Sequence, residues 1–285
     1  MDIGIGLPTT VSGADGRALV AFALRAEAAG FSTLACFDRL VYDNYDSLIA
    51  LAAAAGATER IRLATTVLLA PYRPSVAELA KQLASLDRLS GGRLVLGVSA
   101  GGRADDFAAA GTTYGDRGRR LDRMIEEMRE IWAGRGPFPG IGPRPTGGDV
   151  PVWIGGHSPA ALRRAARHGA GWISPGGSAA GFPQLVEHAR AVFTAQGRTE
   201  APYLVALANV ALGEQRRAEA ERHVLRYYQH LGPKARFLVD SLITDGPGLR
   251  AAVDGFAKAG CDELLLFPCT GDPQHVDDLA AELHR

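Results

Sequence analysis

The feature that most constrains the fold is a regular alternation of short apolar runs with longer amphipathic segments along the 285 residues. The amphipathic segments form eight helical regions, the clearest of which is Arg119–Ala133, with one apolar face. Alternation of this kind specifies a parallel sheet with crossover helices, and eight units in a chain of this length predict a (β/α)8 TIM barrel. The eight predicted strands are Ile3–Leu7, Thr33–Phe37, Ile61–Leu69, Leu94–Ser99, Val150–Ile154, Gly171–Ser174, Tyr203–Val210 and Glu263–Phe267.

An open doubly wound sheet is the alternative architecture, and it would carry a dinucleotide fingerprint after its first strand. Here Gly4 and Gly6 are followed by Pro8, and the third glycine is missing, so this reading fails. We predict one domain over residues 1–285, with an irregular proline- and glycine-rich insertion at residues 134–149, after the fourth β/α unit.

Composition excludes several classes of partner. Lysine plus arginine equals aspartate plus glutamate, at 31 each, so no basic field attracts nucleic acid or an anionic membrane. No apolar run approaches the roughly 18 residues of a membrane span.

The three cysteines form no C-x-x-C pair, and the N-terminus does not resemble a signal peptide, which indicates a cytoplasmic protein. No histidine spacing matches a metal motif, and we predict no metal site.

Glycine pairs follow three of the predicted strands, at the barrel end where active sites of such folds lie. They are Gly101-Gly102, Gly155-Gly156 and Gly176-Gly177. Ser158 and Pro159 follow the second pair as a helix cap and first helical residue. Glycine lets a ligand approach the backbone, and a helix N-terminus attracts anions. We therefore expect a phosphate-bearing ligand, although tight strand-to-helix turns alone would also explain the pairs.

Several segments resemble the bacterial luciferase-like family of flavin- or deazaflavin-dependent oxidoreductases. The most specific is L-D-R-L-S-G-G-R-L-V-L-G-V, within Leu79–Gly111. M-D-I-G-I-G-L-P at the start, R-I-R-L-A-T-T-V at Arg60–Val67 and V-P-V-W-I-G-G-H-S at Val150–Ser158 add to it. The likeness covers nearly the whole chain, and it implies a (β/α)8 barrel with the cofactor ring across the barrel mouth.

The resemblance also implies where the cofactor binds. The ring would rest against a bulge in the third strand, often a non-prolyl cis peptide, near Thr66 and Val67. The insertion at residues 134–149 would lie near the mouth. The cofactor-binding residues implied are Thr66, Val67, Ala100, Gly101, Gly102, Asp105, Gly155, Gly156, His157 and Ser158, to which the glycine argument adds Gly176 and Gly177.

Two positions depart from the family pattern. Many relatives have a histidine after the acidic residue that ends the second strand, where it serves as acid or base, whereas here Asp38 is followed by Arg39. We take Asp38 and Arg39 as the candidate catalytic residues; arginine cannot shuttle a proton but could bind an anion or polarise an oxygen. Gly102 replaces a glutamate of the sugar-phosphate dehydrogenases, which argues against glucose 6-phosphate as substrate.

The resemblance, with an alanine-, glycine- and arginine-rich composition, favours a coenzyme F420-dependent oxidoreductase that transfers a hydride to or from a small organic molecule. One alternative is an FMN-dependent monooxygenase supplied with reduced flavin by a partner reductase. Its ring needs shielding from water, and the predicted mouth offers little aromatic bulk beyond Tyr42, Tyr45 and Trp153. Another alternative is a cofactor-binding protein without turnover. By analogy with relatives we expect a homodimer formed through the second and third helices.

Overall fold

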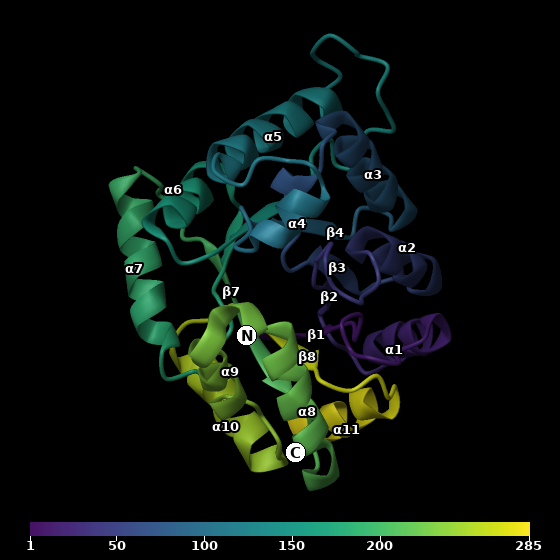
Figure 1. Ribbon diagram of the computed structural model, residues 1–285, viewed down its shortest axis with the longest axis vertical. Coiled ribbons are helices and arrows are strands. Elements are labelled where there is room, and N and C mark those ends of the chain that lie inside the picture. The colour runs from purple at the N-terminus through teal and green to yellow at the C-terminus, as the bar shows by residue number, and fades with distance from the viewer.

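The computed structural model describes residues 1–285 and shows a closed barrel of eight parallel strands in sequence order, surrounded by helices (Figure 1). The predicted fold class is confirmed. The strands are β1 (Asp2–Gly6), β2 (Thr33–Cys36), β3 (Arg62–Thr65), β4 (Leu94–Val98), β5 (Val152–Gly155), β6 (Gly171–Ile173), β7 (Tyr203–Val210) and β8 (Glu263–Pro268).

The helices begin where the sequence supplies capping groups. The side chains of Asp46, Ser75 and Ser158 each accept a backbone N–H in the first turn of the helix that follows. None of the helices is long and apolar enough to span a membrane. The helices are α1 (Gly16–Ala28), α2 (Ser47–Ala57), α3 (Val76–Leu89), α4 (Ala104–Ala109), α5 (Arg117–Trp132), α6 (Pro159–His168), α7 (Phe182–Ala195), α8 (Glu214–Tyr227), α9 (Arg236–Asp240), α10 (Gly246–Lys258) and α11 (Gln274–Leu283), with 3-10 helices η1 (Ala70–Tyr72) and η2 (Gln229–Ala235).

The third strand is shorter than the sequence predicts. The regular ladder of β3 ends at Thr65, a non-prolyl cis peptide joins Thr66 to Val67, and Leu68 returns to β4 through an isolated bridge. Gly97 of β4 allows the two strands to approach closely, because a Cβ at this position would lie 2.0 Å from the carbonyl oxygen of Thr65. The cis peptide lies where the family resemblance places one.

A long excursion separates β7 from α10. It comprises residues 211–245, contains α8, η2 and α9, and returns to the sheet where Ile243 pairs with Val210. Since the excursion leaves the C-terminal end of β7, it lies over the barrel mouth, in front of the strands in Figure 1. We call it the capping excursion.

The expected place of the insertion at residues 134–149 is wrong. This segment leaves the C-terminus of α5 and enters β5, so it lies at the N-terminal end of the barrel, opposite the mouth. There Lys81 Nζ donates to the carbonyl oxygen of Gly142 (2.9 Å), and the Thr146 N–H donates to Asp87 Oδ2 (2.6 Å). In Figure 1 the loop projects beyond α3 and α5 at the top. It therefore cannot shape the substrate site.

The base of the barrel is held by a buried acidic residue. Glu263 is fully buried, and its carboxylate accepts hydrogen bonds from Thr33 Oγ1 (2.5 Å), Ser32 Oγ (2.6 Å) and Arg62 Nη1 (3.1 Å). Each of these donors comes from the β2 or β3 region, whereas Glu263 opens β8, so the carboxylate links strands across the barrel. Above it the interior is apolar, filled by residues such as Leu265.

We expect Glu263→Ala to lower the free energy of unfolding by about 3 kcal/mol, because it leaves the Arg62 guanidinium and two hydroxyl groups without their buried acceptor. Urea denaturation would measure the change. Glu219→Ala is the matched control, since Glu219 is exposed on α8 and forms no ion pair, and a change within about 0.5 kcal/mol is expected. Equal stability of the two variants would contradict a stabilising role for Glu263.

Candidate active site

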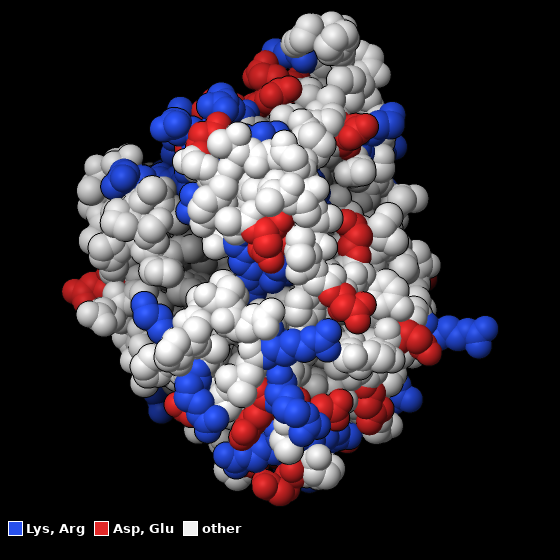
Figure 2. Space-filling model, in the orientation of Figure 1, with Lys and Arg blue, Asp and Glu red and all other residues white.

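The carboxyl ends of all eight strands meet at one end of the barrel, and every site residue predicted from the sequence lies in or beside the loops at this end. Figure 2 shows this face hollowed between α6 and α7 on one side and α4 on the other. The three glycine pairs lie at the carboxyl ends of β4, β5 and β6, which are neighbours in the closed barrel. The barrel therefore brings the candidate cofactor-binding loops together around one opening.

The floor of the mouth is formed by the segment with the cis peptide and by the end of β5. A Cβ on Gly155 would lie 2.7 Å from Val67 Cγ1, so glycine is required for this contact. Gly156 follows with a φ of +118°, a backbone conformation that glycine adopts readily. The structure thus places Thr66 and Val67 directly beside Gly155 and Gly156, although nearly 90 residues separate the two segments in the sequence.

Several backbone N–H groups around this floor have no hydrogen-bond acceptor within the protein. Those of Gly102, His157, Ser158, Gly176 and Gly177 donate to no backbone or side-chain acceptor. The Ser158 side chain caps α6 by accepting the Ala161 N–H (3.2 Å). Free N–H donors at a helix N-terminus bind phosphate well. The three glycine loops therefore fit a phosphate-bearing cofactor.

Asp38 lies beneath the mouth and is 4% exposed. Its carboxylate accepts the Leu69 N–H (2.9 Å) and both Nη atoms of Arg73 (2.9 and 3.2 Å). The hydroxyl groups of Tyr72 and Ser47 complete the set, each at 3.2 Å. A carboxylate that is buried and surrounded by donors holds its neighbours in place. This geometry favours a positioning role for Asp38 over the catalytic role expected from the sequence.

Arg39 is engaged by two carboxylates of α4. Its Nε donates to both oxygens of Asp106 (2.9 and 3.2 Å), and its Nη2 donates to Asp105 Oδ2 (3.1 Å). The side chain of Asp106 is fully buried and also accepts the N–H groups of Leu40 and Val41. Arg39 and Asp105, predicted for different roles, are therefore ion-pair partners that join the β2 loop to α4.

Sequence reasoning missed an aromatic wall on the β2 and β8 side of the mouth. Phe37 stacks on Phe267 with 3.8 Å between ring centroids and on Tyr227 of the capping excursion with 5.3 Å. Tyr42 meets the edge of Tyr227 at 5.2 Å. Trp153, which the sequence suggested for the mouth, lies instead inside the barrel near the base, where it faces Arg62. Of the residues of this wall, the sequence suggested only Tyr42 for the mouth.

Arg103 links the capping excursion to the β4 loop. Its guanidinium lies 4.7 Å from the centroid of the Tyr227 ring, and its Nη2 donates to the Tyr227 carbonyl oxygen (3.0 Å). Its Nε donates to His230 Nδ1 (3.1 Å), which leaves the proton of the neutral imidazole on Nε2. Arg103 has no carboxylate partner. It therefore brings an uncompensated positive charge to the rim of the mouth.

Burial controls the protonation of two side chains of the capping excursion. Burial, with the positive charges of Arg103 and Arg39, lowers the pKa of His230 to about 4. Burial also raises the pKa of Tyr227 to about 12. Both side chains are uncharged at neutral pH, so guanidinium groups carry the positive charge at this side of the mouth.

The network around Asp38 gives a testable result. We expect Asp38→Asn to lower the free energy of unfolding by about 2 to 3 kcal/mol, because the nearly buried guanidinium of Arg73 loses its charged partner. Asp105→Asn is the matched control, since that side chain is 53% exposed and its ion pair contributes less than about 1 kcal/mol. Urea denaturation of both variants checks this. A similar decrease in the free energy of unfolding of the two variants would argue against a positioning role for Asp38.

Comparison with known proteins agrees with this geometry. The family model described as luciferase-like monooxygenase matches residues 1–285. An uncharacterised protein of Mycobacterium tuberculosis is 32% identical over 212 residues, which cover 63% of this chain and 73% of that protein. An F420-dependent glucose-6-phosphate dehydrogenase of Nocardia farcinica is 30% identical over 195 residues, which cover 62% of this chain and 58% of the dehydrogenase.

Two solved structures share the fold. An F420-dependent secondary alcohol dehydrogenase in complex with an F420–acetone adduct has a TM-score of 0.78 at 16% identity, covering 98% of this chain and 96% of its own. The oxygenating constituent of 3,6-diketocamphane monooxygenase from Pseudomonas putida, in complex with FMN, has a TM-score of 0.71 at 17% identity, covering 94% and 91%. With the family model matching its whole length, the chain belongs to the luciferase-like family of oxidoreductases, which has both F420-dependent and FMN-dependent members.

Proposed function

We propose that the protein is a coenzyme F420-dependent oxidoreductase that transfers a hydride to or from a small organic substrate at the barrel mouth. The observation that carries this proposal is the set of free backbone donors on the glycine loops, grouped beside the segment with the cis peptide. These donors would bind the cofactor phosphate, and the cofactor ring would lie above Val67. The preference for F420 rests on the family resemblance and on the F420-dependent relative from Nocardia farcinica.

In this proposal the cofactor supplies the hydride chemistry, and the protein supplies binding, orientation and charge. Arg39 is held by Asp105 and Asp106, so it fixes the shape of the mouth and exchanges no proton. Arg103 is the cation free to attract a substrate oxygen, and the neutral His230 beside it can donate a hydrogen bond through Nε2. These two residues take the place of the histidine that many relatives carry after β2.

The substrate we propose is not a sugar phosphate. The relative from Nocardia farcinica is a glucose-6-phosphate dehydrogenase, but Gly102 here replaces the glutamate that the resemblance implies for such enzymes. Phe37 and Tyr42 of the aromatic wall are half-buried and offer apolar surface instead, while Tyr227 behind them is buried. Alcohols, ketones and enones with an apolar body suit this mouth better.

The aromatic wall also favours one alternative function, an FMN-dependent monooxygenase supplied by a partner reductase. Such an enzyme must exclude water from its reactive flavin. The stacked rings of Phe37, Phe267 and Tyr227 cover one side of the mouth, which is more aromatic bulk than the sequence predicts there.

Parallel titrations with F420 and with FMN, oxidised and reduced, followed by ring fluorescence, distinguish these functions. We expect F420 to bind at least roughly tenfold more tightly than either form of FMN, a difference of about 1.4 kcal/mol. Tighter binding of reduced FMN would instead support the monooxygenase. Binding of F420 without reduction or oxidation of it by any alcohol, ketone or enone in a broad panel would support a cofactor-binding protein without turnover.

A variant of the glycine loop serves as the structural control of this titration. Gly156→Ala places a Cβ 3.1 Å from the Ala161 side chain at a φ of +118°, so the loop with the His157 and Ser158 N–H groups must shift. Gly92→Ala creates a similar contact, 3.3 Å from Thr146 at a φ of +88°, but at the opposite end of the barrel. Only Gly156→Ala should weaken cofactor binding roughly tenfold.

We propose further that the protein forms a homodimer through α2 and α3, as the resemblance implies. A groove of about 500 Å³ lies between these helices, and Ile49 and Leu89 beside it are 69% and 71% exposed. Exposed apolar patches of this kind mark interaction sites.

The dimer proposal predicts that Ile49→Lys with Leu89→Lys gives a monomer in sedimentation velocity, because charge replaces apolar surface on this face. Phe237→Lys on α9 is the control, since Phe237 is equally exposed at 74% but lies on another face. A wild-type monomer, or a double variant that remains dimeric, would contradict this interface.

A further inference from the structure

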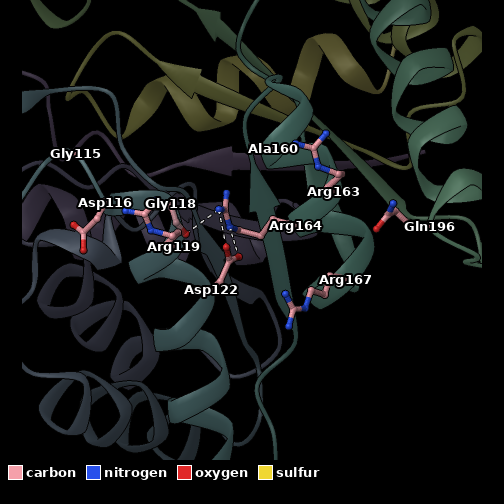
Figure 3. Close-up of a pocket in the computed structure, with 10 residues that line it drawn as sticks. All are labelled: Gly115, Asp116, Gly118, Arg119, Asp122, Ala160, Arg163, Arg164, Arg167 and Gln196. Carbon is pink, nitrogen blue, oxygen red and sulfur yellow. Dashed lines mark hydrogen bonds and ion pairs between the residues drawn. The ribbon is translucent and has the colours of Figure 1, made fainter.

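An arginine-rich groove runs along the outside of the barrel between α5 and α6 (Figure 3). It has a volume of about 480 Å³. One wall is the N-terminal part of α5, which includes Arg119, and the other is the face of α6 that carries Ala160, Arg163, Arg164 and Arg167. We call it the arginine groove.

Two of the four arginines build the groove. Arg164 is 8% exposed and donates to both oxygens of Asp122 (2.6 and 3.1 Å) and to the Gly118 carbonyl oxygen (2.8 Å), which ties α6 to α5. Arg167 pairs with Glu126 (3.0 Å). These contacts hold the two walls at a fixed separation.

The other two arginines are free. The guanidinium groups of Arg119 and Arg163 are exposed and take part in no hydrogen bond or ion pair. Of the two carboxylates of the groove, Asp122 is bound by Arg164, whereas Asp116 pairs only with Arg123 at 3.8 Å and its Oδ1 accepts no hydrogen bond, so two carboxylates stand against four guanidinium groups. In Figure 3 Arg119 and Arg163 lie on opposite walls. The groove therefore presents uncompensated positive charge from both sides.

One end of the groove is formed by the first turns of α5 and α6, and α6 directly follows the candidate phosphate loop that ends at Ser158. Ala160 lines it only two residues after Ser158, and α5 starts with Arg117, whose Nε donates to the Gly101 carbonyl oxygen (2.8 Å). The residues of α6 that line the groove recur at helical spacing from Ala160 to Arg167. This stretch of the helix is on the order of 10 Å long. Because α6 starts at the mouth, the groove leads from the phosphate loops down the outer wall.

We propose that the arginine groove binds the oligoglutamate chain that coenzyme F420 carries beyond its phosphate. This inference rests on the proposed function. Each glutamate of the chain adds a carboxylate, and a guanidinium binds carboxylate strongly and with matched geometry. FMN ends at its phosphate and has no group that could reach Arg163. The groove would thus give F420, and not FMN, an additional binding surface on this chain.

The test compares F420 bearing its oligoglutamate chain with the same cofactor from which the chain has been removed, by dissociation constants from ring fluorescence at low salt. The chain should tighten binding roughly tenfold, as expected for a few exposed charge pairs. Arg119→Ala with Arg163→Ala should remove most of this advantage while leaving the affinity for chain-free F420 unchanged. Raising the salt concentration should reduce the advantage in the wild type.

Arg88→Ala with Arg190→Ala is the matched control, because both arginines are exposed, unpaired and outside the groove. This double variant removes the same amount of charge, so it should still bind F420 with the oligoglutamate chain more tightly than chain-free F420. Equal binding of both F420 forms by the wild type, or equal loss in the two double variants, would overturn the groove assignment and leave the F420 function standing. Binding of FMN alone would overturn the proposed function itself.

Discussion

The mouth of this barrel depends on one buried carboxylate. Asp38 receives the Leu69 N–H, the guanidinium of Arg73 and the hydroxyl groups of Tyr72 and Ser47. A buried charge without partners would be costly, so the donors and the carboxylate must be in place together. Since the segment with the cis peptide leads directly into Leu69, the same contacts fix the floor on which a cofactor ring would rest. The geometry of the site thus depends on Asp38, which is almost completely buried beneath the mouth.

The fold could be predicted because its determinants are local. Most of the strands are short, largely apolar runs, and pairs such as Ser158 and Pro159 mark helix starts within two residues. The contacts of the site are not local: Arg39 meets Asp106 across 67 positions, and Arg103 meets His230 across 127. No spacing in the sequence signals such pairs. The insertion at residues 134–149 was misplaced because its position was inferred from resemblance, whereas its connection from a helix to the next strand already specifies the opposite end of the barrel.

The glycine pairs show how one sequence pattern can meet different physical requirements. Gly155 is needed because Val67 occupies the space of its Cβ, and Gly156 because its φ is positive. Gly177, in contrast, has no atom within 4 Å of a Cβ built on it, so no contact within the protein requires glycine there. A glycine pair in the sequence therefore does not by itself identify a close approach of the backbone, and only the structure shows which glycines are required by a neighbouring side chain or by the backbone conformation.

Arginine serves two separate purposes in this chain. Arg39, Arg73 and Arg164 are nearly buried, and each is paired with a carboxylate, so these three stabilise the fold. Arg103, Arg119 and Arg163 have no carboxylate partner and border the mouth and the arginine groove. The net charge of zero does not distinguish these paired arginines from the unpaired ones. Because the free cations extend well past the phosphate loops, they match a ligand whose negative charge continues beyond a single phosphate, which distinguishes F420 from FMN.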